Sequence, residues 1–134
     1  MKPARADRRF SLAETAERIG VGLAERDEST AWVAVRDFVD GYRSAPHAAR
    51  FGLIEARPRP IDPRFDAYLA ALAEHLAVHD RLCVPAWSAE STRFLDQWWF
   101  PTRFRALHAM ALVQSPASFR RRGVFVDATE FQRV

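Results

Sequence analysis

Two histidines lie four residues apart in the stretch EHLAVH, at His75 and His79. On a helix this spacing projects both imidazoles from one side, and such a pair can chelate zinc. A zinc protease would need a glutamate directly after the first histidine, where this chain has Leu76. A third ligand would have to come from Cys83, His108 or an acid. We therefore expect no metal here, and interpret the histidines as groups that cap a helix or pack at a domain edge, as a pH-sensing pair or as partner contacts.

Cys83 is the single cysteine of the chain. It stands between apolar neighbours in RLCVPAW, so we expect a buried structural thiol. A nucleophilic cysteine needs a dedicated histidine and an oxyanion site, and no local pattern supplies them. The sequence also lacks a phosphate-cradling glycine loop, a GxSxG motif and a paired-cysteine knuckle. We predict no catalytic residues, no cofactor and a protein that is not an enzyme.

Aromatic side chains are concentrated in RFLDQWWFPT, residues 93–102. We expect a helix here that begins at Ser88 and ends before Pro101. The face predicted to be core is formed by Phe94, Leu95 and Trp98. Trp99 lies about 100° away on such a helix, and Phe100 lies a further step round. These two side chains are predicted to face a partner, because tryptophan is over-represented at binding hot spots.

Three consecutive arginines stand in SPASFRRRGVFVD, namely Arg120, Arg121 and Arg122. Ser115 and Pro116 are expected to be the N-cap and first residue of a short helix, and Gly123 the residue after its end. The arginines then fall in the last turn, where cations suit the negative end of the helix dipole. They point in three directions, so they form no flat patch. We interpret them as a solvated helix end or a contact with an acidic protein, and phosphate contact is a weaker alternative.

Charge is unevenly distributed along the chain. The formal net charge is +3, but residues 1–9 and 115–134 are basic while the body between them is mildly acidic. TAERIGVG, residues 15–22, resembles the first half of a helix-turn-helix, yet Arg26 and Ser29 stand where its second helix would need apolar residues. A nucleic-acid-binding transcriptional regulator that uses the basic N-terminus and the arginine triplet is the alternative function.

Apolar residues recur at helical spacing through most of the chain. Ser11 and Glu14 form a predicted capping box ahead of the first helix, and a second helix begins near Asp27. Asp62 and Pro63 are the predicted N-cap and first residue of a long helix. We predict an all-α fold, a compact bundle of five or six helices with a short extended C-terminal segment.

Length and composition favour one compact unit. A chain of 134 residues, 49% of them hydrophobic, is long enough to bury a core without metals or disulfides. We expect a flexible basic N-terminus over residues 1–10 and a single helical domain over residues 11–134. The single cysteine and the lack of a membrane-spanning apolar run favour a cytoplasmic protein with no membrane contact.

The segments LAALAEHLAVH, PAW, RFLDQWWFP and SPASFRRRGVFVDATEF, in this order, resemble a group of short proteins from GC-rich bacteria. The likeness covers about residues 28–134. Many members of that group are encoded beside a nucleotidyltransferase-fold protein, in an arrangement similar to toxin–antitoxin pairs. The resemblance implies that this chain is the antitoxin, which neutralises a toxin that transfers nucleotides to RNA.

A protein-binding role therefore stands as the first hypothesis, with the nucleotidyltransferase-fold toxin as partner and DNA as the alternative partner. An antitoxin needs exposed aromatic and charged groups more than it needs a cleft. The predicted partner-binding residues are Trp99, Phe100, Arg120, Arg121, Arg122, His75 and His79.

Overall fold

The structure is a computed structural model that describes residues 9–102 and 107–126. The chain divides into two compact units, Met1–Asp62 and Pro63–Val134, and each has its own helices. The prediction that residues 11–134 form a single domain concerns how these units join, and it stays a prediction.

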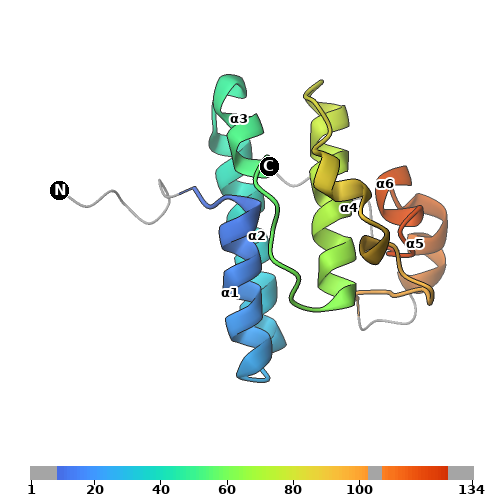
Figure 1. The fold of residues 1–134 in the computed structure, drawn as a ribbon. Helices are drawn as coiled ribbons and strands as arrows, with labels where there is room; N and C mark the ends of the chain where they lie inside the picture. Colours follow the sequence, from blue (N-terminus) through green and yellow to red (C-terminus); the bar gives the residue numbers. More distant parts are fainter. Residues whose placement is uncertain (1–8, 103–106, 127–134) are drawn as a thin grey trace. The chain divides into compact units, whose positions relative to one another are not determined.

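Six α-helices and no β-strand occur in the described residues, which confirms the predicted all-α class and helix number (Figure 1). The helices are α1 (Leu12–Ala24), α2 (Glu28–Ser44), α3 (His47–Ile54), α4 (Pro63–His79), α5 (His108–Gln114) and α6 (Ala117–Arg120). Two 3₁₀ turns, Ala86–Ala89 and Ser91–Arg93, lie between α4 and α5.

Helix α1 begins at the capping box that the sequence predicts. The Glu14 amide donates to the Ser11 hydroxyl at 3.1 Å, and the Ser11 amide donates to the Glu14 carboxylate at 3.0 Å. These bonds satisfy two groups that a bare helix start leaves unpaired. The residues buried on its inner face include Leu12, Ala16 and Ile19. Most of the predicted flexible segment 1–10 lies outside the described residues.

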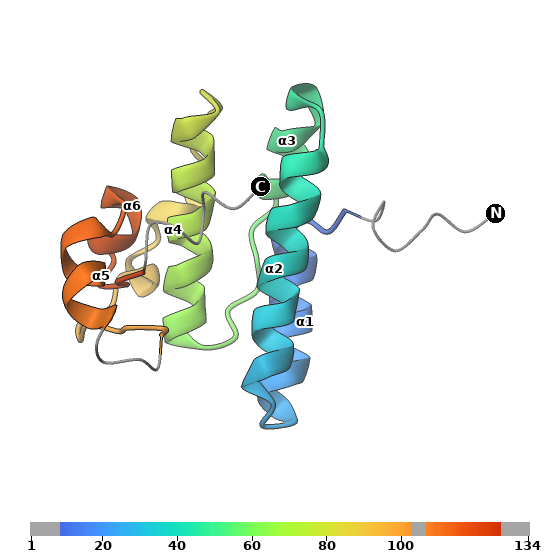
Figure 2. The same cartoon turned by 180° about the vertical axis from the view of Figure 1, so that it is seen from behind.

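A tight turn joins α1 to α2 within the first unit. The Asp27 amide donates to the Gly22 carbonyl at 2.8 Å, and Arg26 adopts φ 57°. A Cβ on Gly22 would lie 3.0 Å from the Asp27 carbonyl oxygen, so this close approach requires glycine. Asp27 then caps α2 through the Thr30 amide. Figures 1 and 2 show α1 and α2 side by side, the arrangement of an αα-hairpin rather than of a helix-turn-helix.

Arginines close the far end of this hairpin. The Arg50 guanidinium, on α3, donates to the Ala45 and Arg43 carbonyls at 3.1 Å each. Arg9 donates to the Ser44 carbonyl at 3.3 Å. These cations lie where the last carbonyls of α2 are unpaired and where the helix dipole is negative. Side-chain caps therefore hold both ends of α2.

Helix α4 is the central element of the second unit. It begins at Pro63, as predicted, since proline suits the first helical position. Its apolar side chains are buried around most of the helix circumference. They are Phe65, Ala67, Tyr68, Leu69, Ala70, Ala71, Leu72, Ala73, Leu76 and Ala77. Elements packed against α4 include α6 and both 3₁₀ turns.

The prediction of a helix that begins at Ser88 and ends before Pro101 is wrong. Two 3₁₀ turns take its first part, and the chain after Phe94 is bent and then extended. The Leu95 and Trp99 amides donate to the carbonyls of Arg122 and Gly123, and thus not to carbonyls four residues back. Backbone hydrogen bonds to a distant segment have replaced the helical bonds between neighbouring turns. Tryptophan and phenylalanine are also residue types that favour an extended backbone.

The predicted start of α6 is wrong, whereas its predicted end is confirmed. Ser115 is not an N-cap, because its buried hydroxyl bonds to the Ala111 carbonyl and to both the amide and the carbonyl of Val126. Helix α6 instead follows Pro116 without a side-chain cap. Gly123 does end α6 with φ 78°, as predicted, and Val124 opens the short extended segment.

Candidate protein-binding surface

The candidate surface is built on two extended segments of the second unit. Trp99 and Val124 form a parallel bridge. The Trp99 amide donates to the Gly123 carbonyl at 2.8 Å, and the Phe125 amide donates to the Trp99 carbonyl at 2.9 Å. A Cβ on Gly123 would lie 3.3 Å from the Leu95 Cβ, so glycine lets the two segments approach. These backbone bonds fix the side chains around Trp99.

Trp99 is turned toward α4. Its ring lies edge-on to Phe65 and Tyr68, with centroid separations of 5.4 and 6.4 Å. The Arg64 guanidinium lies 5.2 Å from the ring centroid, a cation–π distance. The indole is therefore half-buried and covered on several sides, although the sequence predicts that it faces a partner. Its role in partner binding stays a prediction.

Trp98 and Phe100 lie on the opposite side of the segment, because neighbours alternate in an extended chain. Trp98, predicted to be core, is 67% exposed, and that prediction is wrong. Its ring lies edge-on to the ring of buried Phe125, with a centroid separation of 5.0 Å. Phe100 is half-buried between two rings, stacked on Phe125 at 5.3 Å and on His108 at 4.3 Å. We call Trp98, Phe100, His108 and Phe125 the aromatic cluster.

Helix α5 adds aliphatic side chains to this surface. Met110 is 46% exposed and Val113 is 76% exposed, whereas Ala111 is fully buried and anchors the helix. His108, its first residue, belongs to the aromatic cluster. Arg120 donates to the Val113 carbonyl at 2.8 Å and so closes the helix end with an exposed cation. An apolar helix face with a basic rim thus adjoins the aromatic cluster.

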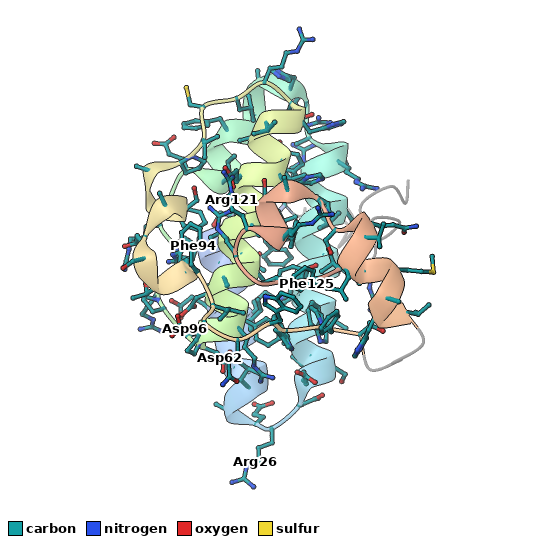
Figure 3. The ribbon with its side chains drawn as sticks, turned by 90° about the vertical axis from the view of Figure 1, so that its right-hand side faces the viewer. Arg26, Asp62, Phe94, Asp96, Arg121 and Phe125 are labelled. Atoms are coloured by element: carbon teal, nitrogen blue, oxygen red, sulfur yellow. The ribbon has the colours of Figure 1, made fainter. Side chains whose placement is uncertain are left out.

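The remaining two arginines of the triplet share one carboxylate. Arg121 and Arg122 both pair with Glu74 on α4. Arg121 is exposed (Figure 3), whereas Arg122 is buried. Arg122 also donates to the carbonyls of Ser88 and Ser118 at 2.8 and 2.9 Å. Arg122 therefore ties three segments together, and its charge is compensated inside the unit.

The pKa values of Glu74 and Arg122 reflect the ion pairs between them. Burial by itself raises the pKa of the Glu74 carboxyl, but the hydrogen bonds and charges of Arg121 and Arg122 outweigh it, so the pKa lies below its usual value. Burial lowers the pKa of the Arg122 guanidinium, and the bond to Glu74 opposes that change. The Glu74 carboxylate and the Arg122 guanidinium are therefore both charged at neutral pH.

The two predicted histidines are placed differently. His75 is half-buried, and its ring lies edge-on to Phe119 at 6.0 Å. His79 is exposed at the end of α4. Cys83 is exposed too, so the prediction of a buried thiol is wrong. Within residues 9–102 and 107–126, no three His, Cys, Asp or Glu side chains group in a way that could hold a metal ion.

Two structural residues of this unit have no signal in the local sequence. Arg93 is fully buried, donates to the Asp66 carbonyl at 3.3 Å and lies 4.8 Å from the centroid of the Trp87 ring. Glu74 pairs with two arginines that lie almost fifty residues further along the chain. Because the Asp66 and Glu74 contacts join distant segments, no motif or spacing in the sequence indicates them.

Comparison of the chain with protein-family models, curated proteins and solved structures gives no match. The resemblance to partner proteins of nucleotidyltransferase-fold toxins stays a prediction. In the part of the chain that the structure describes, every helix is too short or too polar to span a bilayer.

Proposed function

We propose that this chain is a non-catalytic protein-binding module and that the aromatic cluster with the exposed face of α5 is its binding surface. The observation that carries the proposal is Trp98, whose indole is two-thirds exposed. Tryptophan is the residue type most typical of interface hot spots. Leaving such a large apolar ring in water is unfavourable by itself, and covering it with a partner would recover that free energy.

Rigidity of this surface supports the proposal. Phe125, beneath Trp98, is buried, and the Trp99 backbone on which the segment depends pairs on both its amide and its carbonyl. A side chain that is already ordered loses little conformational entropy on binding. The surface is thus pre-organised for association.

The partner that we propose is a nucleotidyltransferase-fold toxin, which makes this chain its antitoxin. The resemblance of residues 28–134 supports this choice. Such an enzyme binds nucleoside triphosphates and RNA, which are polyanions, so its substrate surface is expected to be basic. Asp96, which is exposed two residues before Trp98, is a charge near the aromatic cluster that suits such a basic surface.

The experiment uses the purified full chain and the nucleotidyltransferase-fold protein that the resemblance predicts beside its gene. Mixed at micromolar concentration on a sizing column, the two proteins should elute as one complex. Val113→Ala should weaken the complex, whereas Val21→Ala, which truncates an exposed valine of α1, should not. Two separate peaks for the unmodified proteins would overturn the proposal.

A nucleic-acid-binding regulator is the second candidate, because Arg120 and Arg121 remain exposed on the second unit. It predicts that the chain retains double-stranded DNA and that the affinity falls steeply with salt. Arg120→Ala would then weaken DNA binding at every sequence tested, as expected for a phosphate contact. Partner binding that persists at a salt concentration where DNA retention is lost would separate the two candidates.

A further inference from the structure

Within residues 9–102 and 107–126, one backbone edge of the second unit carries peptide groups that have no hydrogen-bond partner. The Trp99 amide and carbonyl both point toward Gly123–Phe125. In an extended chain the groups of neighbouring residues point the opposite way, so those of Trp98 and Phe100 point away from that segment. Among the described residues, none bonds to the backbone amide or carbonyl of Trp98 or Phe100.

The opposite side of this two-segment pairing is already occupied. The Val124 amide donates to the Phe119 carbonyl, and the amide and carbonyl of Val126 both bond to the Ser115 hydroxyl. Pro101 lacks an amide hydrogen, but by the same alternation its nitrogen faces the occupied side. As far as the structure describes the chain, the Trp98–Phe100 edge is thus the open one, with two donors and two acceptors.

From this placement we propose that an extended segment of the partner protein adds as a strand along Trp98–Phe100. This inference rests on the proposed function and names the mode of binding. Main-chain pairing would supply the hydrogen bonds, and every second side chain of the added segment would contact the aromatic cluster. A helix in the partner cannot supply these main-chain hydrogen bonds, because the peptide groups within a helix are already paired with one another.

The charge of Asp96 indicates which side chains the added partner segment should carry. Asp96 is exposed two residues before Trp98 (Figure 3), and it makes no ion pair within the described residues. Aromatic rings occupy the surface beyond it, at Phe100 and His108. The segment that fits is therefore extended, with alternating apolar side chains and a lysine or arginine at the end that meets Asp96.

Hydrogen–deuterium exchange of the full chain, with and without the neighbouring nucleotidyltransferase-fold protein, tests the proposal. The amides of Trp98 and Phe100 should exchange rapidly in the free chain and become protected in the complex. Trp98→Ala removes the indole and keeps the amide, whereas Trp98→Pro removes both. Trp98→Pro should bind roughly fivefold more weakly than Trp98→Ala, the loss expected for one main-chain hydrogen bond.

Circular dichroism and the melting temperature of the two Trp98 variants establish that both remain folded. A complex in which these amides stay unprotected, or in which both variants bind equally, would overturn strand addition and leave the protein-binding function intact. Protection of the same amides in the free chain, together with a dimer on the sizing column, would assign the edge to a second copy and also overturn the proposal. Absence of any complex would overturn the proposed function and, with it, this inference.

Discussion

The two units of the molecule make their long-range side-chain contacts in different environments. In Met1–Asp62, Arg59 pairs with Glu17 and Arg18 pairs with Asp37, and all four side chains are at least partly exposed. In Pro63–Val134, buried Arg122 reaches Ser88 and Glu74. Exposed ion pairs contribute little to stability, whereas a buried charge depends on every partner that it has. The first unit therefore depends on helix caps and apolar packing, whereas the second adds a buried polar network to its apolar core.

Removing Arg122 should cause the largest loss of stability. Arg122→Ala leaves Glu74 with only its exposed arginine and leaves the Ser88 and Ser118 carbonyls without this donor. We expect the free energy of unfolding of the second unit to fall by about 3 kcal/mol or more. Native-state hydrogen exchange, followed separately for each unit, measures this loss. An equal loss of protection in α1 and α2 would contradict the comparison.

Glycine substitutions sharpen the same contrast. Gly123→Ala forces a Cβ into φ 78° and to within 3.3 Å of Leu95, so it should destabilise the second unit by about 1–2 kcal/mol. Gly52→Ala, in α3, meets nothing within 4 Å and should stabilise the first unit by about 0.5–1 kcal/mol. Urea denaturation of both variants measures the change in the free energy of unfolding, which should be negative for Gly123→Ala and positive for Gly52→Ala. Stabilisation by Gly123→Ala would contradict the close approach at this glycine.

Acidification should act on the second unit through Glu74. Its pKa is lowered in the folded state, so the carboxylate stabilises that state fully above its ordinary pKa of 4.5. This contribution is lost as the pH falls through the lowered folded value. Hydrogen exchange in α4 and α6, measured below pH 4.5, should show the loss, and Glu74→Gln should remove this part of the pH dependence. A pH dependence that is identical in Glu74→Gln would refute the assignment.

Arg59→Ala should have the smallest effect. Its pair with Glu17 is exposed on both sides, and such pairs typically contribute about 0–1 kcal/mol. Urea denaturation at low and at high salt checks the prediction, because screening should remove what little the pair contributes. A loss as large as that of Arg122→Ala would show that exposure does not distinguish the two units.

Local sequence signals predict the parts of the fold whose partners lie nearby in the chain. The Ser11 capping box and the helix start at Pro63 are confirmed, and so is the glycine after α6. Each rests on bonds within one turn of a helix or on the backbone freedom of a single residue.

The errors occur where a distant segment takes the local partner. Ser115 has the residue type of a cap, but its hydroxyl bonds to Val126, eleven residues away. Trp98 is exposed and not in the core as predicted, because pairing with residues 122–125 changes the side-chain period from helical to alternating. The sequence therefore predicts that this surface is rich in aromatic residues, but it does not predict which of their side chains face solvent.

The affinity of the chain for the nucleotidyltransferase-fold protein that we propose as its partner, measured by calorimetry for the unmodified chain and for Trp98→Ala, tests the central claim most directly. Trp98 is exposed and rests on Phe125, so Trp98→Ala should leave the fold unchanged and weaken binding at least about 10-fold. Val21→Ala provides an exposed apolar control on the other unit and should keep the original affinity. An unchanged affinity for Trp98→Ala would contradict a binding surface centred on this tryptophan.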